Sequence, residues 1–241
     1  MTTDLVAGRD ASLFRTTRWT RVGLAKTASE EGRRALAELC EAYYEPVLAF
    51  LRCDLRDADA AQEMSHAFFE QVLEGGRIQS ADPARGKFRS YLLGAVKHFL
   101  SHCREAAART KRGGGVETVS LQDTDVGNMP DGGVSPDAAF DRCWAATVLG
   151  RGVEALRVEY VAEGKAKLFD HLRPLLSGDV SHGEQAQLAE ASGMSVPALR
   201  MAAHRLRKRL RACVKAEVAG TLDDPDQVQE EMRALFAALG G

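Results

Sequence analysis

Apolar residues recur at the spacing of α-helices along much of the chain. The clearest pattern lies in residues 88–109, where they recur at i, i+3, i+4, i+7 and i+8 and then continue in the same way: Phe88, Tyr91, Leu92, Ala95, Val96, Phe99, Leu100 and Cys103. This spacing places all of them on one face of a helix. Residues 33–52 and 58–74 show a similar period, and no stretch in this half alternates as a β-strand does. The pattern predicts an all-α fold.

The opposite face of the predicted 88–109 helix is polar and largely basic. At about 100° per residue it carries Lys97, His98, Ser101, Arg104 and Glu105. A helix that buries an aromatic stripe and exposes cations and hydrogen-bonding groups suits contact with nucleic acid.

Farther along the chain, residues 140–163 and 165–176 predict two more helices. A short helix at 184–191, a turn containing Gly193 and a longer helix at 196–211 then follow the pattern of a helix-turn-helix. Ser195 is placed to cap the longer helix, and Pro197 falls in its first turn. Its inward stripe consists of Val196, Leu199, Ala203, Leu206 and Leu210. The residues that face outward or lie along the flanks are Ala198, Arg200, Met201, His204, Arg205 and Lys208. An ordinary helical hairpin is the alternative.

Glycine, proline and acidic residues interrupt the helical pattern between the two halves. We therefore predict a domain at 14–112, a flexible acidic linker at 113–137, a helix-turn-helix domain at 138–216 and an acidic helical extension at 217–241. In the extension Asp224 caps a helix and Pro225 takes its first position. That amphipathic helix either packs on its own domain or binds a partner.

Charge is distributed unevenly, although the chain as a whole is nearly neutral. The 241 residues contain 32 Lys and Arg against 34 Asp and Glu. Residues 85–112 hold eight basic residues and one acidic residue, and 200–216 hold seven basic residues and no acidic residue. Residues 113–141 hold six acidic residues and no basic one, and 217–241 hold six acidic residues and one basic residue. Each basic run alone is typical of a solvated helix face, whereas two matched runs favour a polyanion as partner.

The sequence shows no set of residues that would support catalysis. It contains no nucleophile motif, no phosphate-binding glycine loop and no dinucleotide fingerprint. We therefore expect no enzymatic activity, no cofactor and no small-molecule substrate. The five cysteines are scattered and never spaced C-x-x-C, which argues against a disulfide framework or zinc ribbon and suggests buried thiols. His98 and His102 lie four residues apart beside Cys103, but no further residue completes four ligands, so no metal is expected.

The composition, 45% apolar and 27% charged, is that of a folded soluble protein. No apolar stretch approaches the roughly 20 residues of a membrane span. Near the start, Asp4, Arg9 and Asp10 stand where a secretory signal needs an apolar core. We expect no membrane contact and a cytoplasmic protein.

Several segments together resemble the extracytoplasmic-function sigma factors. Residues 57–74 and 82–100 are similar to region 2 of that family, and 193–210 are similar to its region 4. The similarity continues through 111–115 and 140–144. Thr16 to Trp19 and the acidic C-terminal helix resemble one subgroup of sigma-factor-like proteins.

The resemblance implies a transcription initiation factor that binds core RNA polymerase and directs it to promoter DNA. It assigns polymerase contact to Glu63, His66, Phe69 and Glu70, with Met64 and Phe68 more typical of core. Recognition and melting of the -10 element fall to Arg89, Lys97, His98, Ser101, His102 and Arg104. Recognition of the -35 element falls to Arg200, Met201, His204, Arg205 and Lys208. The acidic linker matches the family segment that runs through the RNA exit path.

Some positions depart from the family pattern. His66 replaces a common glutamine, Pro197 and Ala198 replace a small polar pair, and Ala202 replaces an arginine. The promoter sequence is therefore not predicted. An anti-sigma protein is a further possible partner. The alternative function is a helix-turn-helix DNA-binding regulator that acts without polymerase, or a degenerate sigma-like protein held by a protein partner.

Overall fold

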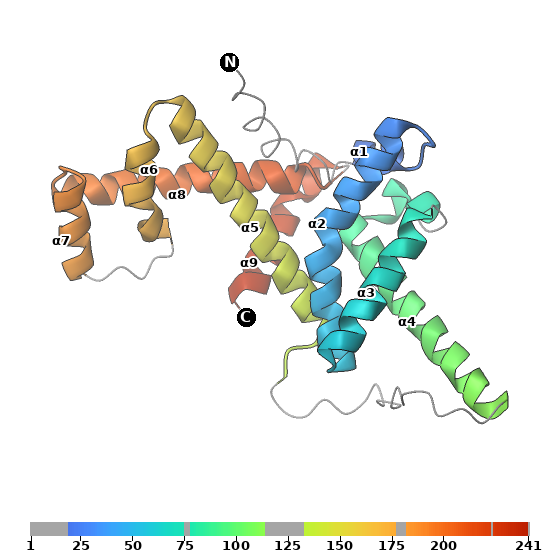
Figure 1. Ribbon diagram of the computed structural model, residues 1–241. Coiled ribbons are helices and arrows are strands. Elements are labelled where there is room, and N and C mark those ends of the chain that lie inside the picture. Colours follow the sequence, from blue (N-terminus) through green and yellow to red (C-terminus); the bar gives the residue numbers. More distant parts are fainter. Residues whose placement is uncertain (1–18, 75–77, 114–132, 177–181, 223, 241) are drawn as a thin grey trace, which may run out of the picture. The chain divides into compact units, whose positions relative to one another are not determined.

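The computed structural model describes residues 19–74, 78–113, 133–176, 182–222 and 224–240. Every regular element in these ranges is helical, which confirms the all-α class (Figure 1). The α-helices are α1 (Trp19–Ala25), α2 (Glu30–Leu55), α3 (Ala58–Leu73), α4 (Phe88–Gly113), α5 (Pro136–Ala162), α6 (Ala166–Leu172), α7 (His182–Ala191), α8 (Val196–Ala219) and α9 (Val228–Gly240). Short 3-10 turns lie at Ile78–Ser80, Pro83–Arg85, Arg173–Leu176 and Pro225–Gln227.

Two compact units share these helices. Among the described residues, the first unit holds 19–145 with 221, 222 and 234–240, and the second holds 146–220 and 224–233. The division falls inside α5, so the first ten residues of that helix belong with α1 to α4.

The first unit is built around the aromatic stripe of α4. Phe88 packs edge-on against both Trp19 of α1 and Tyr43 of α2, with ring centroids 5.9 Å and 5.4 Å away. Farther along α4, Phe99 packs against Phe68 of α3 at 5.6 Å. These rings are all buried, and together they hold α4 against the three preceding helices.

Local caps explain where the helices of this unit begin. Ser29 accepts a hydrogen bond from the backbone N–H of Gly32 at the start of α2, and Asp57 accepts from Asp59 and Ala60 at the start of α3. Between them, Arg56 adopts a left-handed conformation with φ of 55° and ends α2. The turn between the two helices is therefore only a few residues long.

The second unit contains the short helix, the glycine turn and the longer helix on which the helix-turn-helix prediction depends. Gly193, with φ of 65°, makes the turn between α7 and α8, and Ser195 accepts from the backbone N–H of Ala198 at 3.3 Å. Leu199 and Leu206 of α8 are buried against Leu156 of α5 and against the apolar residues of α6. The cap, the turn and the inward stripe all agree with the prediction.

Some boundaries differ from the sequence prediction. α8 continues past Arg211 to Ala219, because Cys213, Val214 and Val218 extend its buried stripe. α5 begins at Pro136 rather than at residue 140, since the hydroxyl of Ser135 accepts from the backbone N–H of Ala138.

Two further segments tighten into 3-10 turns that the periodicity did not indicate. One is Arg173–Leu176, after α6, which contains Pro174. The other is Pro225–Gln227, where the predicted cap Asp224 accepts from the backbone N–H of Asp226.

Most of the predicted acidic linker lies outside the described residues. Its last two positions, Pro136 and Asp137, form the start of α5.

We expect opposite effects from alanine at two neighbouring glycines of α5. A Cβ at Gly152 would lie 2.4 Å from Val214 Cγ2 of α8, whereas one at Gly150 meets nothing within 4 Å. Gly152→Ala should lower the free energy of unfolding by about 1–3 kcal/mol through overpacking. Gly150→Ala should raise it by about 0.5–1 kcal/mol through helix propensity. Urea denaturation of the two variants measures both effects, and equal shifts would contradict the packing of α5 on α8.

Candidate nucleic-acid interface

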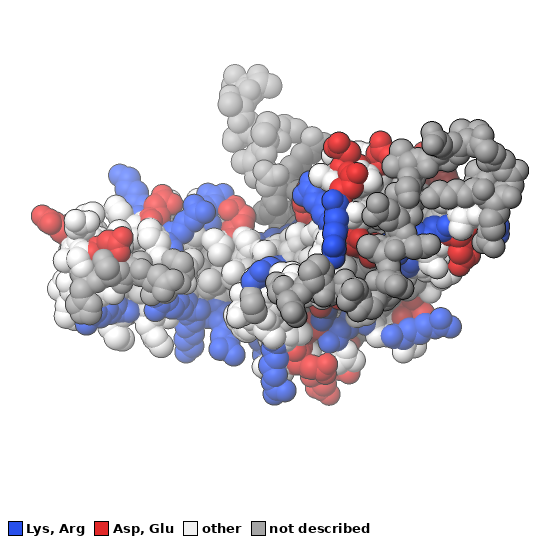
Figure 2. Space-filling view, turned by 90° about the horizontal axis from the view of Figure 1, so that it is seen from below, with Lys and Arg blue, Asp and Glu red and all other residues white. Residues whose placement is uncertain are grey.

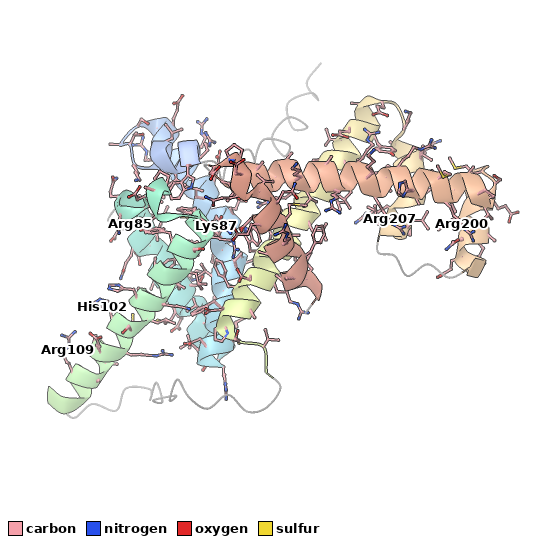
Figure 3. All side chains as sticks on the ribbon, turned by 180° about the vertical axis from the view of Figure 1, so that it is seen from behind. Arg85, Lys87, His102, Arg109, Arg200 and Arg207 are labelled. Carbon is pink, nitrogen blue, oxygen red and sulfur yellow. The ribbon has the colours of Figure 1, made fainter. Side chains whose placement is uncertain are left out.

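The six residues predicted to contact the -10 element all lie on α4, but they occupy different surroundings. Lys97, His98, Ser101 and His102 are exposed, and Arg104 is half-buried. Figure 3 shows His102 and Arg109 along the part of α4 that leads to its C-terminal end. The aromatic stripe of the same helix faces the core, so the predicted polar face is an outer surface of the first unit.

Arg89 is the exception, because it packs against the start of α5. Its Nη1 donates to Asp141 Oδ1 at 2.5 Å, and its Cζ lies 4.5 Å from the ring centroid of Trp144. Only 14% of the Arg89 side chain is exposed. In this structure Arg89 therefore holds α5 against α4 and keeps most of its side chain out of solvent, whereas the resemblance assigned it to the -10 contact.

The two other cations of this set are in ion pairs at the surface. Lys97 Nζ lies 2.6 Å from Asp137 Oδ2 of α5, and Arg104 Nη2 lies 2.5 Å from Asp54 Oδ2 of α2. Pairs as exposed as Lys97 and Asp137 contribute roughly 0–1 kcal/mol. Such a lysine can exchange its carboxylate for a nucleic-acid phosphate at little cost.

The remaining three residues form short contacts within α4 itself. His98 and His102 approach each other with their Nε2 atoms 3.1 Å apart and their ring centroids at 4.3 Å. Ser101 donates to Glu105 Oε1 at 3.4 Å. Glu105 is thus the one acidic group placed on this face of the helix.

On α8 the structure brings together the residues predicted to contact the -35 element. Met201, His204, Arg205 and Lys208 are exposed, and within the described residues none of the four side chains makes a hydrogen bond or ion pair. Met201, at 58%, is the most exposed large apolar side chain described. Arg200 donates from Nε to Gln185 Oε1 of α7 at 3.1 Å, which links the N-terminal part of α8 to the preceding helix.

Two other arginines of the basic run on α8 have structural roles. Arg207 donates from Nε and Nη2 to the backbone oxygen of Leu175, at 3.0 Å and 2.6 Å, and so caps the turn after α6. Arg209 bonds to Glu159 of α5 and to Glu163 in the turn that follows it, and its guanidinium lies over the ring of Tyr160. Hydrogen bonds from Arg209 and then from Lys165 lower the pKa of Glu163 to about 2.

Counting charges along the sequence could not separate these structural arginines from the exposed cations, because both occur in one run. Figure 2 shows exposed Lys and Arg side chains interspersed with Asp and Glu. Exposed cations that make no internal pair are the ones suited to phosphate contacts.

Three of the four residues predicted to contact polymerase, His66, Phe69 and Glu70, line an open groove on α3. The groove has a volume of about 680 Å³ and is lined by His66, Phe69, Glu70, Leu73 and Glu74. Phe69 is only 7% exposed and forms its buried floor, while Glu63, His66 and Glu70 are exposed. Phe68 is fully buried, in agreement with its interpretation as core.

Leu73 is a candidate contact residue that the sequence analysis missed. It is 51% exposed although it is a large apolar side chain. It follows His66 and Phe69 at intervals that keep all three on one side of α3, and this spacing was the available signal. On the same side, Tyr44 of α2 stacks on the ring of His66, and its hydroxyl lies 3.0 Å from His66 Nε2.

Four of the five thiols have a raised pKa and are therefore protonated at neutral pH. Burial raises the pKa of Cys40 to about 12 and that of Cys213 to about 11, and it also raises the pKa of Cys53 and Cys143. Only Cys213 is fully buried, whereas the other four cysteines are half-buried, which corrects the sequence interpretation. None of the four thiols with a raised pKa has the lowered value of a nucleophilic cysteine.

Within the described residues, no group of three or more His, Cys, Asp or Glu side chains is arranged to hold a metal ion. None of the described helices combines the length and apolarity that crossing a bilayer requires. Protein-family models, curated proteins and solved structures show no match to this chain.

Arg89 and Lys97 should differ in their effect on stability. Arg89→Ala removes a mostly buried ion pair and a cation–π contact, so we expect the free energy of unfolding to fall by about 1–3 kcal/mol. Lys97→Ala removes an exposed pair and should change it by less than about 1 kcal/mol. Urea denaturation of the two variants tests this difference. Equal losses would mean that Arg89 does not hold α5 in place.

Proposed function

We propose that the chain is a transcription initiation factor of the extracytoplasmic-function sigma type, without enzymatic activity of its own. The observation that carries the proposal is the exposed row of Met201, His204, Arg205 and Lys208 on the second helix of a helix-turn-helix. In such motifs the second helix enters the major groove with its N-terminal half. Here that half presents cations, an imidazole and a thioether to solvent.

The assignment of DNA contacts on α8 follows from this placement. Arg205 and Lys208 supply charge to the phosphates, which sets affinity, while Met201 and His204 lie where base edges are reached. Arg200, positioned by Gln185, lies nearest the start of the helix and contributes a guanidinium suited to guanine or phosphate. These residues together form the proposed -35 contact.

The outer face of α4 supports a second DNA contact in the first unit. Lys97, His98, Ser101 and His102 offer one cation and three hydrogen-bonding groups along adjacent turns. Single-stranded and partly melted DNA is bound through backbone charge and contacts to unstacked bases. This face therefore suits the proposed melted -10 element, with Arg104 at its edge and Arg89 supporting it from behind.

The groove on α3 supports binding to core RNA polymerase. Its apolar floor of Phe69 and exposed Leu73 is bordered by Glu70 and Glu74, so it fits a protein helix that carries apolar and basic side chains. A partner of this kind is what separates a sigma factor from the alternative, a DNA-binding regulator that acts without polymerase. The proposal places the protein in the cytoplasm with the polymerase and leaves an anti-sigma protein as a further partner.

The polymerase half of the proposal is tested by co-elution. The purified chain should co-elute with bacterial core RNA polymerase and support promoter-dependent run-off transcription. Leu73→Glu places a charge in the groove without disturbing the buried core and should abolish co-elution. Val158→Glu, at an apolar residue of α5 that is 40% exposed, is the matched control and should co-elute normally. DNA binding without co-elution of the unmodified chain would favour the polymerase-independent regulator.

The DNA half is tested by the salt dependence of duplex binding. Arg205→Ala and Lys208→Ala should each reduce the slope of log affinity against log salt by about one unit, because each removes one phosphate contact. Lys215→Ala is the matched control, since Lys215 is also exposed on α8 but lies about 15 Å farther along the helix than Arg205. Fluorescence anisotropy at several salt concentrations gives the slopes. An unchanged slope in the Arg205 and Lys208 variants would exclude the assigned face of α8.

A further inference from the structure

The paired imidazoles of α4 have the geometry of a chelate. His98 and His102 stand one turn apart on the same helix, and both side chains are exposed. Their Nε2 atoms are 3.1 Å apart. Within the described residues neither ring makes a hydrogen bond or ion pair with any other group.

This separation matches the distance between two nitrogens that share one metal ion. With metal–nitrogen bonds of about 2.0–2.1 Å, two ligands lie about 3.3 Å apart at a tetrahedral angle and about 2.9 Å apart at a right angle. The observed 3.1 Å lies between these two values. The separation of the two nitrogens therefore lies within the bite of a transition metal, and rotation of the two exposed rings directs both lone pairs to one ion.

The protonation of the two rings is compatible with a metal ion. Without a metal, only one of the two Nε2 atoms can carry a proton in this contact, because two N–H groups would otherwise point at each other. A metal ion accepts the Nε2 lone pairs of both rings, with each ring's proton on Nδ1. Because both rings are exposed, water can fill the remaining coordination positions without loss of packing.

We propose that His98 and His102 form a two-imidazole binding site for a divalent transition-metal ion of the Ni²⁺, Cu²⁺ or Zn²⁺ class. The sequence expectation of no metal assumed that four protein ligands are needed, whereas an exposed chelate of two imidazoles completed by water requires only the pair. A second part of the proposal rests on the proposed function. The metal occupies two residues of the proposed -10 face, so metal and single-stranded DNA exclude each other.

Calorimetric titration of the full chain with Ni²⁺ under reducing conditions tests the site. We expect one saturable equivalent, with binding weakened by more than about tenfold in both His98→Gln and His102→Gln. His204→Gln is the matched control, because His204 is exposed on a helix but has Arg200 and Lys208, not histidine, one turn away. It should bind Ni²⁺ as the unmodified chain does. Circular dichroism melts in the presence of a chelator verify that all three variants remain folded.

Several results would overturn the site: no saturable binding, unchanged binding in the two α4 variants, or equal loss in the His204 variant. Loss of binding in Cys103→Ser with retention in His98→Gln would place the metal elsewhere and would also overturn it. The titration uses no DNA, so its result is independent of the proposed function.

Anisotropy of a fluorescent single-stranded oligodeoxynucleotide tests the exclusion. Saturating Ni²⁺ should weaken oligodeoxynucleotide binding several-fold in the unmodified chain and in His204→Gln. It should not change the affinity of His98→Gln for the oligodeoxynucleotide. Equal binding with and without Ni²⁺ in the unmodified chain would overturn the exclusion while leaving the metal site intact. Failure of the metal-free chain to bind the oligodeoxynucleotide would instead contradict the proposed role of α4.

Discussion

The contact of Arg89 with Asp141 and Trp144 determines how the first unit is completed. A guanidinium that is mostly removed from water needs both a carboxylate and a polarisable surface, and α5 supplies the two within one helical turn. The neighbouring Phe140 is fully buried as well, so the start of α5 is held by apolar burial in addition to charge. This packing on the other sides of α4 determines where the outer face of the helix lies.

The same contact explains why the basic residues of a charged segment do not all serve to bind a polyanion. Arg89, Arg207 and Arg209 each use the fixed geometry of the guanidinium to join two helices or to cap a turn. The lysines and imidazoles remain at the surface, where their partners are weakly held. A charge count therefore overstates the charge that each basic segment presents to a polyanion, since part of it is neutralised internally.

Periodicity and local chemistry predicted most of the fold. The stripe of α4, the cap at Ser195 and the turn at Gly193 depend on neighbouring residues, so they could be read from the sequence. The partners of Arg89 and Lys97 are 52 and 40 residues away, and a one-dimensional pattern carries no information on such pairs. For the same reason the resemblance assigned Arg89 to the -10 contact without reference to its partners in α5, and Leu73 went unnoticed beside its groove.

The pairing of Lys97 with Asp137 has a consequence for the acidic segment that precedes α5. Residue 113 ends α4, and Asp137, at the start of α5, returns to the middle of that same helix. Both ends of the intervening segment are thus held by one unit. The stability of that unit therefore includes the entropy cost of closing this loop, which depends on the length of the segment. That entropy changes slowly, by about 0.6 kcal/mol for each doubling of length. Insertions there would therefore change the acidic charge of this segment at a small thermodynamic cost.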